Sequence, residues 1–222
     1  SIPPVTAGIK LYLDAGNPAS GTGWLDMSGE NYIVTLGSGM SWSSEIGGCF
    51  NFDGTGNAWA GINAGFGYDY SAGVTVSVLA KFASGGGAWE RLIDFGNGAP
   101  SHNIILCRNG AGNTVLMDIE GQNDSSLNPG EMSITWDGWA MYTMTANGTY
   151  WKQYKNGEFY SWQGNSGLPA IVTRNNNYIG RSNWIADSYY KGSMAVVQIY
   201  NRALSDAEIL QNYQHFQQRT GI

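Results

Sequence analysis

Two carboxylates at alternate positions are the strongest candidates for chemistry in this 222-residue sequence. The segment "LMDIEG" places Asp118 and Glu120 two residues apart, so both side chains lie on one face of an extended strand. Two acids within reach of one bond can act as general acid and base, as the hydrolysis of a glycosidic bond requires. Leu116, two residues before Asp118, offers no third acid to this face. The sequence therefore contains an acid pair without a third carboxylate in line.

A second acid pair, Glu90 and Asp94 in "WERLIDFGNG", is four residues apart and so shares one face of a predicted strand. The same alternation predicts that Arg91 and Ile93 lie on the other face. Two interpretations are open: the acids are directed at a ligand from the rim of a site, or they lie on a solvated outer face. No reaction follows from this pair alone.

Other kinds of site have little support. The histidines are His102 and His215, and neither accompanies a nucleophile-elbow sequence of the kind that a catalytic triad needs. Cys49 and Cys107 lie in apolar, strand-like segments without the spacing of zinc ligands. We expect two buried free thiols, with a disulfide as the alternative. "GTGNAWAG" lacks the third glycine of a dinucleotide-binding fingerprint.

Charge and composition exclude some partners. Only 13% of the residues are charged, the net charge is −6, and no basic run is present, so we expect no nucleic-acid partner. Apolar runs fall far short of the ~20 residues that cross a bilayer, so we expect no membrane partner. The opening "SIPPVTAG" predicts a linker over residues 1–7 that enters a single domain over residues 8–222. We expect the chain to be a matured product or a segment of a larger protein.

Short alternating runs such as "VTVSVLAKF" predict the elements that position these side chains. About thirteen such runs recur between Gly and Asn at a spacing of roughly 8–12 residues, which is typical of an all-β, two-sheet antiparallel jelly-roll sandwich. Asn156 and Gly157 predict a tight hairpin. Long loops over residues 17–31 and 121–130 are expected to stay within the same domain.

A short C-terminal helix is predicted after the last strand. Ser205 and Glu208 have the spacing of a capping box, and Leu204 and Ile209 that of a hydrophobic staple. Arg202, at the corner before the helix, is expected to hold loop carbonyls or an acid rather than a ligand. The corner therefore closes the domain and is not a chemical site.

Segments such as "IKLYLDAGNPAS", "FNFDGTGNAWAGI" and "QIYNRALSDAEI" resemble the concanavalin A-like superfamily in its laminin-G-like branch, over about residues 8 to 216. The resemblance implies two antiparallel sheets, one of them concave, that commonly bind glycans or proteins without catalysis. These sequence segments are also similar to those of domains of phage virion proteins and of bacterial surface or secreted proteins. This similarity implies an extracellular or virion-surface location. Laminarinase-like and κ-carrageenase-like glucanases carry Glu-x-Asp-x-Glu on such a strand, and Leu116 stands where their nucleophile would be. We therefore expect a protein that is not an enzyme.

The same resemblance makes calcium possible, although no cofactor is required. Calcium prefers oxygen ligands from loops, and Asp26 in "LDMSGEN" and Asp53 in "FDGTGN" are the candidates. The alternative is that each aspartate caps its own turn.

A saccharide site combines aromatic rings with planar polar groups. The segment "GRSNWIADSYY" supplies such a set: Arg181, Asn183, Trp184, Asp187, Tyr189 and Tyr190. Two further pairs extend it, Trp89 with Glu90, and Tyr160 with Trp162 on one strand face. The alternative places Trp162 and one of the paired tyrosines in the core.

We expect a non-catalytic carbohydrate-binding, lectin-like or adhesion module of a larger surface, secreted or virion protein, with a glycan or cell-surface polysaccharide as partner. The first alternative is a structural or decoration domain of a phage virion assembly that contacts other virion proteins or itself. A glycoside hydrolase or lyase is the second alternative.

Overall fold

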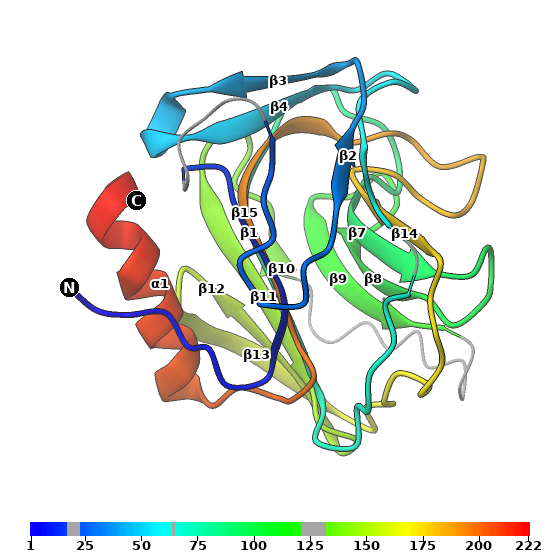
Figure 1. Cartoon of the computed structure of the whole chain (residues 1–222), viewed down its shortest axis with the longest axis vertical. Helices are drawn as coiled ribbons and strands as arrows, with labels where there is room; N and C mark the ends of the chain where they lie inside the picture. The colour runs from blue at the N-terminus through cyan, green and yellow to red at the C-terminus, as the bar shows by residue number, and fades with distance from the viewer. Residues whose placement is uncertain (17–22, 64, 121–131) are drawn as a thin grey trace.

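The computed structural model describes residues 1–16, 23–63, 65–120 and 132–222, which form two antiparallel β-sheets packed face to face (Figure 1). Sheet A has the order β13-β12-β11-β6-β15-β4-β3, with β1 paired to β15. Its strands are β1 (Ile9–Asp14), β3 (Met40–Ser43), β4 (Cys49–Asp53), β6 (Val74–Phe82), β11 (Ala140–Ala146), β12 (Tyr150–Lys155), β13 (Glu158–Gly164) and β15 (Lys191–Tyr200). The predicted jelly-roll sandwich is confirmed.

Sheet B has the order β10-β9-β8-β7-β14-β5-β2. Its strands are β2 (Val34–Leu36), β5 (Ala60–Ile62), β7 (Arg91–Gly96), β8 (Ile104–Arg108), β9 (Thr114–Ile119), β10 (Met132–Ser133) and β14 (Asn176–Ile179). The inner faces of the two sheets enclose one core, in which Val76 and Val78 of β6 and Ile93 and Phe95 of β7 are fully buried. Burial of these β-branched and aromatic side chains drives the two layers together.

Helix α1 (Asp206–Thr220) packs on the outer face of sheet A (Figure 1). Ile209 and Phe216 are buried there in one apolar cluster with Leu79 of β6. The predicted capping box is present, because Ser205 Oγ accepts from the Glu208 amide and the Glu208 carboxylate accepts from the Ser205 amide. Within the described residues no helix covers the outer face of sheet B.

The corner before α1 is confirmed as a closure. The Arg202 guanidinium forms an ion pair with Glu208, and its Nε donates to the Ala7 carbonyl at 2.7 Å. Residues 1–7, expected to be a linker, lie along the helix: the Val5 amide donates to Asn212 Oδ1 at 2.8 Å, and Val5 is buried. This segment is thus held against the domain, and the domain boundary stays a prediction.

Other local predictions can be followed in the described part of the chain. Asn156 and Gly157 have φ angles of 53° and 77° at the β12–β13 turn, as a tight hairpin requires. Cys49 and Cys107 are buried free thiols, one in each sheet, so the free-thiol prediction is confirmed. Residues 17–22 and 121–131, which include the start of the first long loop and the whole of the second, lie outside the described residues. No described helix is long and apolar enough to span a membrane.

Candidate functional site

Six residues of sheet B, one from each of six neighbouring strands, pair directly with one another and form a row across the sheet. Its members, from β2 to β9, are Thr35, Gly61, Tyr178, Asp94, Ile105 and Asp118. Their chain neighbours, such as Ile93 and Met117, point into the core. Because side chains alternate along a strand, the row lies on the outer face of sheet B.

One hollow, which we name the carboxylate hollow, lies at the β7–β9 end of this row. It has a volume of about 260 Å³ and is lined by Trp89, Arg91, Ile105, Asp118, Glu120, Trp184 and Asp187. Ile105, Cys107 and Leu116 form an apolar floor on which Trp184 packs. The structure thus joins the Asp118–Glu120 pair with two of the predicted tryptophans and Asp187.

Asp118 is held in an unusual state for a carboxylate. Burial, and next the neighbouring charge of Glu120, raise the pKa of Asp118 to about 7. Its Oδ1 is buried, and the side chains of Asp118 and Glu120 lie within hydrogen-bond reach of each other. The two acids can therefore share one proton, which is a common arrangement of paired carboxyl groups.

Arg91 fixes the positions of other residues at the hollow through hydrogen bonds. Its Nη2 donates to Asp187 Oδ2 at 2.9 Å, its Nε to Asp94 Oδ2 at 3.2 Å, and its Nη1 to the Trp89 carbonyl at 2.8 Å. The prediction that Arg91 lies on the face opposite Asp94 is wrong, because the register shifts between Arg91 and Ile93. This β-bulge adds one residue to the strand and brings both side chains to the outer face.

Asp94 is fully buried beneath the 181–190 loop. Its carboxylate accepts from the Asn183 amide at 3.0 Å, from Asn183 Nδ2 at 2.8 Å and from Asn103 Nδ2 at 2.8 Å. Because Asp94 is buried, it is neither directed at a ligand from the rim of a site nor part of a solvated outer face, and both predicted interpretations are wrong for it. Asp94 anchors the loop that carries Trp184, and its partners are 89 and 9 residues away in the sequence.

Glu90 is likewise fully buried, so its prediction as a ligand-binding residue is wrong. Its carboxylate accepts from the Lys191 amide at 2.8 Å and pairs with Arg108 at 3.4 Å. Burial raises the pKa of Glu90 to about 7. The residue ties β7 to the start of β15.

Trp89 keeps its predicted place at the surface. Its side chain is 41% exposed, and its φ of 61° lies in the left-handed region that aromatic residues rarely adopt. The Trp89 amide donates to the Gly110 carbonyl at 2.9 Å, which fixes this conformation. Such strain is retained where the surrounding structure holds it, and functional sites are common examples.

The residues of the 181–190 loop separate into different roles. Trp184 and Asp187 line the carboxylate hollow, where Asp187 also accepts from Ser182 Oγ at 2.7 Å. Asn183 turns its amide to Asp94 and so holds the loop rather than a ligand. Tyr190 is fully buried, and its hydroxyl donates to the Lys81 carbonyl at 2.9 Å. The prediction of Tyr190 as a ligand contact is wrong, and the alternative that one paired tyrosine is a core residue is confirmed.

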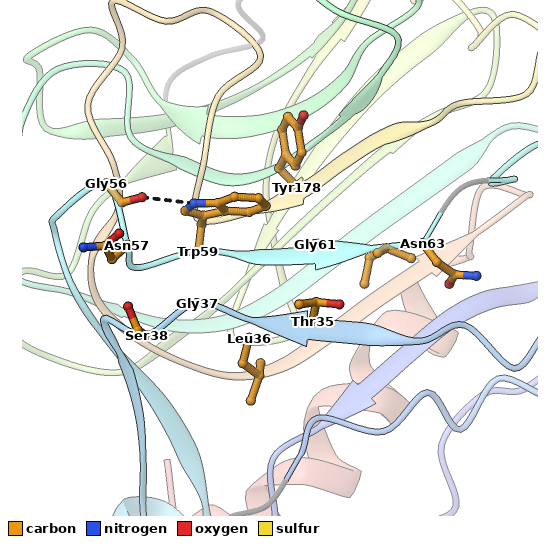
Figure 2. Close-up of a pocket in the computed structure, with 11 residues that line it drawn as sticks. Thr35, Leu36, Gly37, Ser38, Gly56, Asn57, Trp59, Gly61, Asn63 and Tyr178 are labelled. Atoms are coloured by element: carbon orange, nitrogen blue, oxygen red, sulfur yellow. Dashed lines mark hydrogen bonds between the residues drawn. The ribbon is translucent and has the colours of Figure 1, made fainter.

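Arg181 belongs to a second hollow at the other end of the row. Its guanidinium lies over the rings of Trp59 and Tyr178, at 4.5 and 4.4 Å from their centroids. This edge pocket has a volume of about 510 Å³ and is lined by Thr35, Leu36, Gly37, Ser38, Gly56, Asn57, Trp59, Gly61, Ile62, Asn63 and Tyr178 (Figure 2). Tyr189 lies beside Gly56 at its rim. Trp59 was not predicted as a site residue, because its segment carries neither a complete dinucleotide motif nor a neighbouring polar cluster in the sequence.

Tyr160 and Trp162 lie on β13, in the other sheet. They are 43% and 58% exposed, so Trp162 is not the core residue that the alternative describes. The Trp162 ring packs against Tyr150 at 5.4 Å, and the Tyr160 hydroxyl accepts from the Ser133 amide at 3.3 Å. The structure does not bring this pair to the carboxylate hollow.

The two metal candidates cap turns. Asp26 accepts from the amides of Tyr12, Ser28 and Tyr32 at 3.0, 3.0 and 3.1 Å. Asp53 accepts from the Thr55 amide and hydroxyl at 2.8 and 2.7 Å. In the part of the chain that the structure describes, no three His, Cys, Asp or Glu residues gather where they could hold a metal ion. The geometry therefore fits turn capping, and gives calcium no set of ligands there.

Comparison with solved structures shows what this fold is similar to. The binding domain of botulinum neurotoxin serotype G is 15% identical, with a TM-score of 0.71 over 92% of this chain and 50% of that one. The serotype D ligand binding domain, in complex with N-acetylneuraminic acid, is 17% identical, with a TM-score of 0.68 over 95% of this chain and 52% of that one. The chain therefore spans about half the length of these toxin domains.

Domain 4 of AbnA, an extracellular arabinanase from Geobacillus stearothermophilus, matches over nearly its whole length. Its structure, in complex with arabinotriose, is 17% identical, with a TM-score of 0.70 over 93% of this chain and 98% of that one. At such identities the likeness shows the fold alone, and comparison with curated proteins gave no match. The model of one family, the concanavalin A-like lectin/glucanases superfamily, matches residues 50–210. The match covers most of the chain, which therefore belongs to the concanavalin A-like lectin/glucanases superfamily.

Proposed function

We propose that this domain is a non-catalytic, lectin-like module that binds a saccharide in the carboxylate hollow. One observation carries the proposal: the rings of Trp89 and Trp184 meet the carboxylates of Asp118, Glu120 and Asp187 on the uncovered face of sheet B. A sugar has apolar C–H faces and a rim of hydroxyls. Aromatic rings suit the first and carboxylate acceptors suit the second.

Each group has a distinct role in this proposal. Trp184, fixed on the apolar floor, and the exposed Trp89 pack against the sugar ring. The Asp118–Glu120 pair, which lines the hollow, accepts from a sugar hydroxyl. Asp187 accepts from a second hydroxyl while Arg91 and Ser182 hold it in place. Arg91 acts as a positioning residue, because its nitrogens already donate to Asp94, Asp187 and the Trp89 carbonyl.

The charge of the hollow favours neutral saccharides. Among the described residues, three carboxylates and one cation line it, and this cation, Arg91, is neutralised by Asp94 and Asp187. A sugar acid would bring a further negative charge to this wall, and like charges in contact disfavour binding. The structures in complex with arabinotriose and with N-acetylneuraminic acid support saccharide binding by this fold, and the acidic lining favours the neutral class here.

The lining also supports binding without hydrolysis. Leu116, two positions before Asp118 on β9, lies in the apolar floor with Ile105 and Cys107. On the face that carries Asp118 and Glu120, the aliphatic side chain of Leu116 therefore stands where a retaining mechanism needs a nucleophilic carboxylate. Bound sugar is held rather than cleaved.

The direct test is a glycan array followed by titration calorimetry on wild type and Trp184→Ala. Loss of a ring anchor should weaken binding at least about tenfold. Trp162→Ala, an exposed tryptophan on sheet A, is the matched control and should bind as wild type does. Unchanged affinity in Trp184→Ala would remove the hollow from the proposal.

A structural or decoration role in a virion is the second candidate, and one surface favours it. Tyr150, Phe159 and Trp162 line one hollow on the β12–β13 hairpin and expose 43 to 58% of their area. Neighbouring exposed rings of this kind are typical of a surface covered by another subunit. Light scattering behind size exclusion tests it: a dimer that dissociates in Trp162→Ala supports self-association, and a monomer at high concentration contradicts it. A location outside the cell or on a virion surface is part of both candidates.

A further inference from the structure

The edge pocket has the features of a saccharide site in its own right. The Trp59 indole lies over β5 beside Gly61, where an added Cβ would come within 3.3 Å of the ring (Figure 2). Its Nε1 donates to the Gly56 carbonyl at 3.1 Å, and Tyr178 meets the ring edge-on at 5.3 Å. The aromatic wall is thus fixed from two strands and a loop.

Besides the two rings, several glycines and the apolar Leu36 and Ile62, the edge pocket is lined by uncharged polar side chains. Thr35, Ser38, Asn57 and Asn63 contribute hydroxyl and amide groups, and the Arg181 guanidinium lies beside the pocket over the rings of Trp59 and Tyr178. Asn63 Oδ1 accepts from the Ile33 amide at 2.8 Å, which fixes the orientation of that side chain. Hydroxyls and primary amides match the alternating donors and acceptors of a neutral sugar.

The edge pocket and the carboxylate hollow lie along one line. Gly61 and Tyr178 line the first, and Ile105 and Asp118 line the second, and all four are members of the row across sheet B. At about 4.8 Å per strand, the row places the two floors roughly 10 to 20 Å apart. A monosaccharide is shorter than this span, whereas an oligosaccharide can cover it.

One loop connects the two hollows. Arg181 lies over the aromatic wall of the edge pocket, and Trp184, three residues later, packs on the floor of the carboxylate hollow. Between them, Asn183 is fastened to the buried Asp94. The loop therefore sets the relative position of the two hollows.

We infer that the edge pocket is a second saccharide subsite, so that the domain prefers a neutral oligosaccharide spanning both hollows to a shorter sugar. This inference rests on the proposed function of the carboxylate hollow. It adds the class of ligand: an extended, uncharged chain that passes from one hollow to the other over the 181–190 loop, which covers Asp94 between them. Each hollow then contributes its own aromatic wall to one ligand.

Titration calorimetry with arabino-, xylo-, cello- and laminari-oligosaccharides, from mono- to hexasaccharide, tests the inference. For a series that binds, wild-type affinity should rise with chain length. Trp59→Ala and Tyr178→Ala should each weaken hexasaccharide binding about tenfold and leave disaccharide binding unchanged. Trp59→Phe, which keeps a ring, should recover most of the loss, and Phe159→Ala on sheet A should have no effect. Thermal unfolding checks that each variant is folded.

The other outcomes separate this inference from the proposed function. Unchanged hexasaccharide affinity in both Trp59→Ala and Tyr178→Ala, with binding lost in Trp184→Ala, would overturn the second subsite alone. An equal loss at every chain length would place the primary site in the edge pocket and overturn the two-subsite assignment. Absence of wild-type binding to every sugar and to a full glycan array would contradict both proposals.

Discussion

Asn183 donates to both carboxylate oxygens of the buried Asp94, through its backbone amide at 3.0 Å and its Nδ2 at 2.8 Å. The two residues belong to different segments, a surface loop and the central strand β7. The contact satisfies a carboxylate that has no access to water, and it fixes the loop that carries Trp184 and Asp187. A buried, hydrogen-bonded acid therefore determines where the exposed groups of the hollow lie.

Asn183→Ala should lower both stability and saccharide affinity. Loss of the Nδ2 donor leaves Asp94 Oδ1 with fewer partners, which costs about 1 to 3 kcal/mol of the free energy of unfolding. The loop that holds Trp184 also loses a side-chain attachment. Chemical denaturation and calorimetry measure the two effects. Ile185→Ala, on the same loop but fully exposed, is the control and should change neither. Wild-type stability in Asn183→Ala would contradict the anchoring role.

Asp118 should make the domain less stable as pH rises. Its pKa in the folded protein is about 7, above the ordinary 3.8, so the folded state binds a proton more tightly than the unfolded state. The free energy of unfolding should therefore fall as pH rises from about 4 to about 7. Asp118→Asn should reduce this slope and unfold at a higher temperature than wild type at pH 8.

Denaturation curves at a series of pH values test this effect. Glu90, whose pKa is also about 7, contributes a slope of the same sign, so Glu90→Gln should remove a separate part of it. A wild-type slope retained in Asp118→Asn would show that Asp118 is not the group responsible. The same variant should bind saccharide more weakly, because its amide offers one acceptor oxygen where the carboxylate offers two.

Neutral glycans should bind better than acidic ones. For a neutral glycan that binds, an analogue carrying a uronic acid should bind at least about tenfold more weakly at low salt, because of the three carboxylates of the hollow. Higher ionic strength should reduce this difference in affinity. The substitution Glu120→Gln should also reduce the difference, because it removes one of the carboxylates. Tighter binding of the acidic analogue would contradict the assignment.

No sugar should be released from polysaccharides by the wild-type protein. Incubation with laminarin, carrageenan and arabinan, followed by an assay for reducing ends, measures this. The expected result follows from Leu116 in the floor of the hollow. Release that disappears in Glu120→Gln would show catalysis by the acid pair.

Features set by neighbouring residues were predictable from the sequence. The capping box of Ser205 and Glu208 and the turn at Asn156 and Gly157 depend on contacts within a few positions, and both are present. Alternating apolar residues likewise predicted the two-sheet sandwich. The 181–190 loop was identified as a source of aromatic and polar groups, and Trp184 and Asp187 do line a hollow.

Features set by distant partners were not predictable in this way. The burial of Glu90 depends on Arg108 and on the Lys191 amide, which is 101 residues away. The side of the sheet on which Arg91 lies depends on a bulge that no local pattern marks. The aromatic wall of the edge pocket forms because Trp59 and Tyr178 meet from opposite halves of the chain.

The central claim is that a saccharide binds the uncovered face of sheet B between Trp89 and Trp184. Two-dimensional ¹H–¹⁵N NMR of the tryptophan indoles, assigned by substitution and recorded during titration with a binding oligosaccharide, tests this most directly. We expect the chemical shifts of the Trp89 and Trp184 indole signals to change in a saturable manner. The chemical shift of the Trp162 signal, on sheet A, should not change. Saturable shifts at Trp162 with none at Trp89 and Trp184 would contradict this claim.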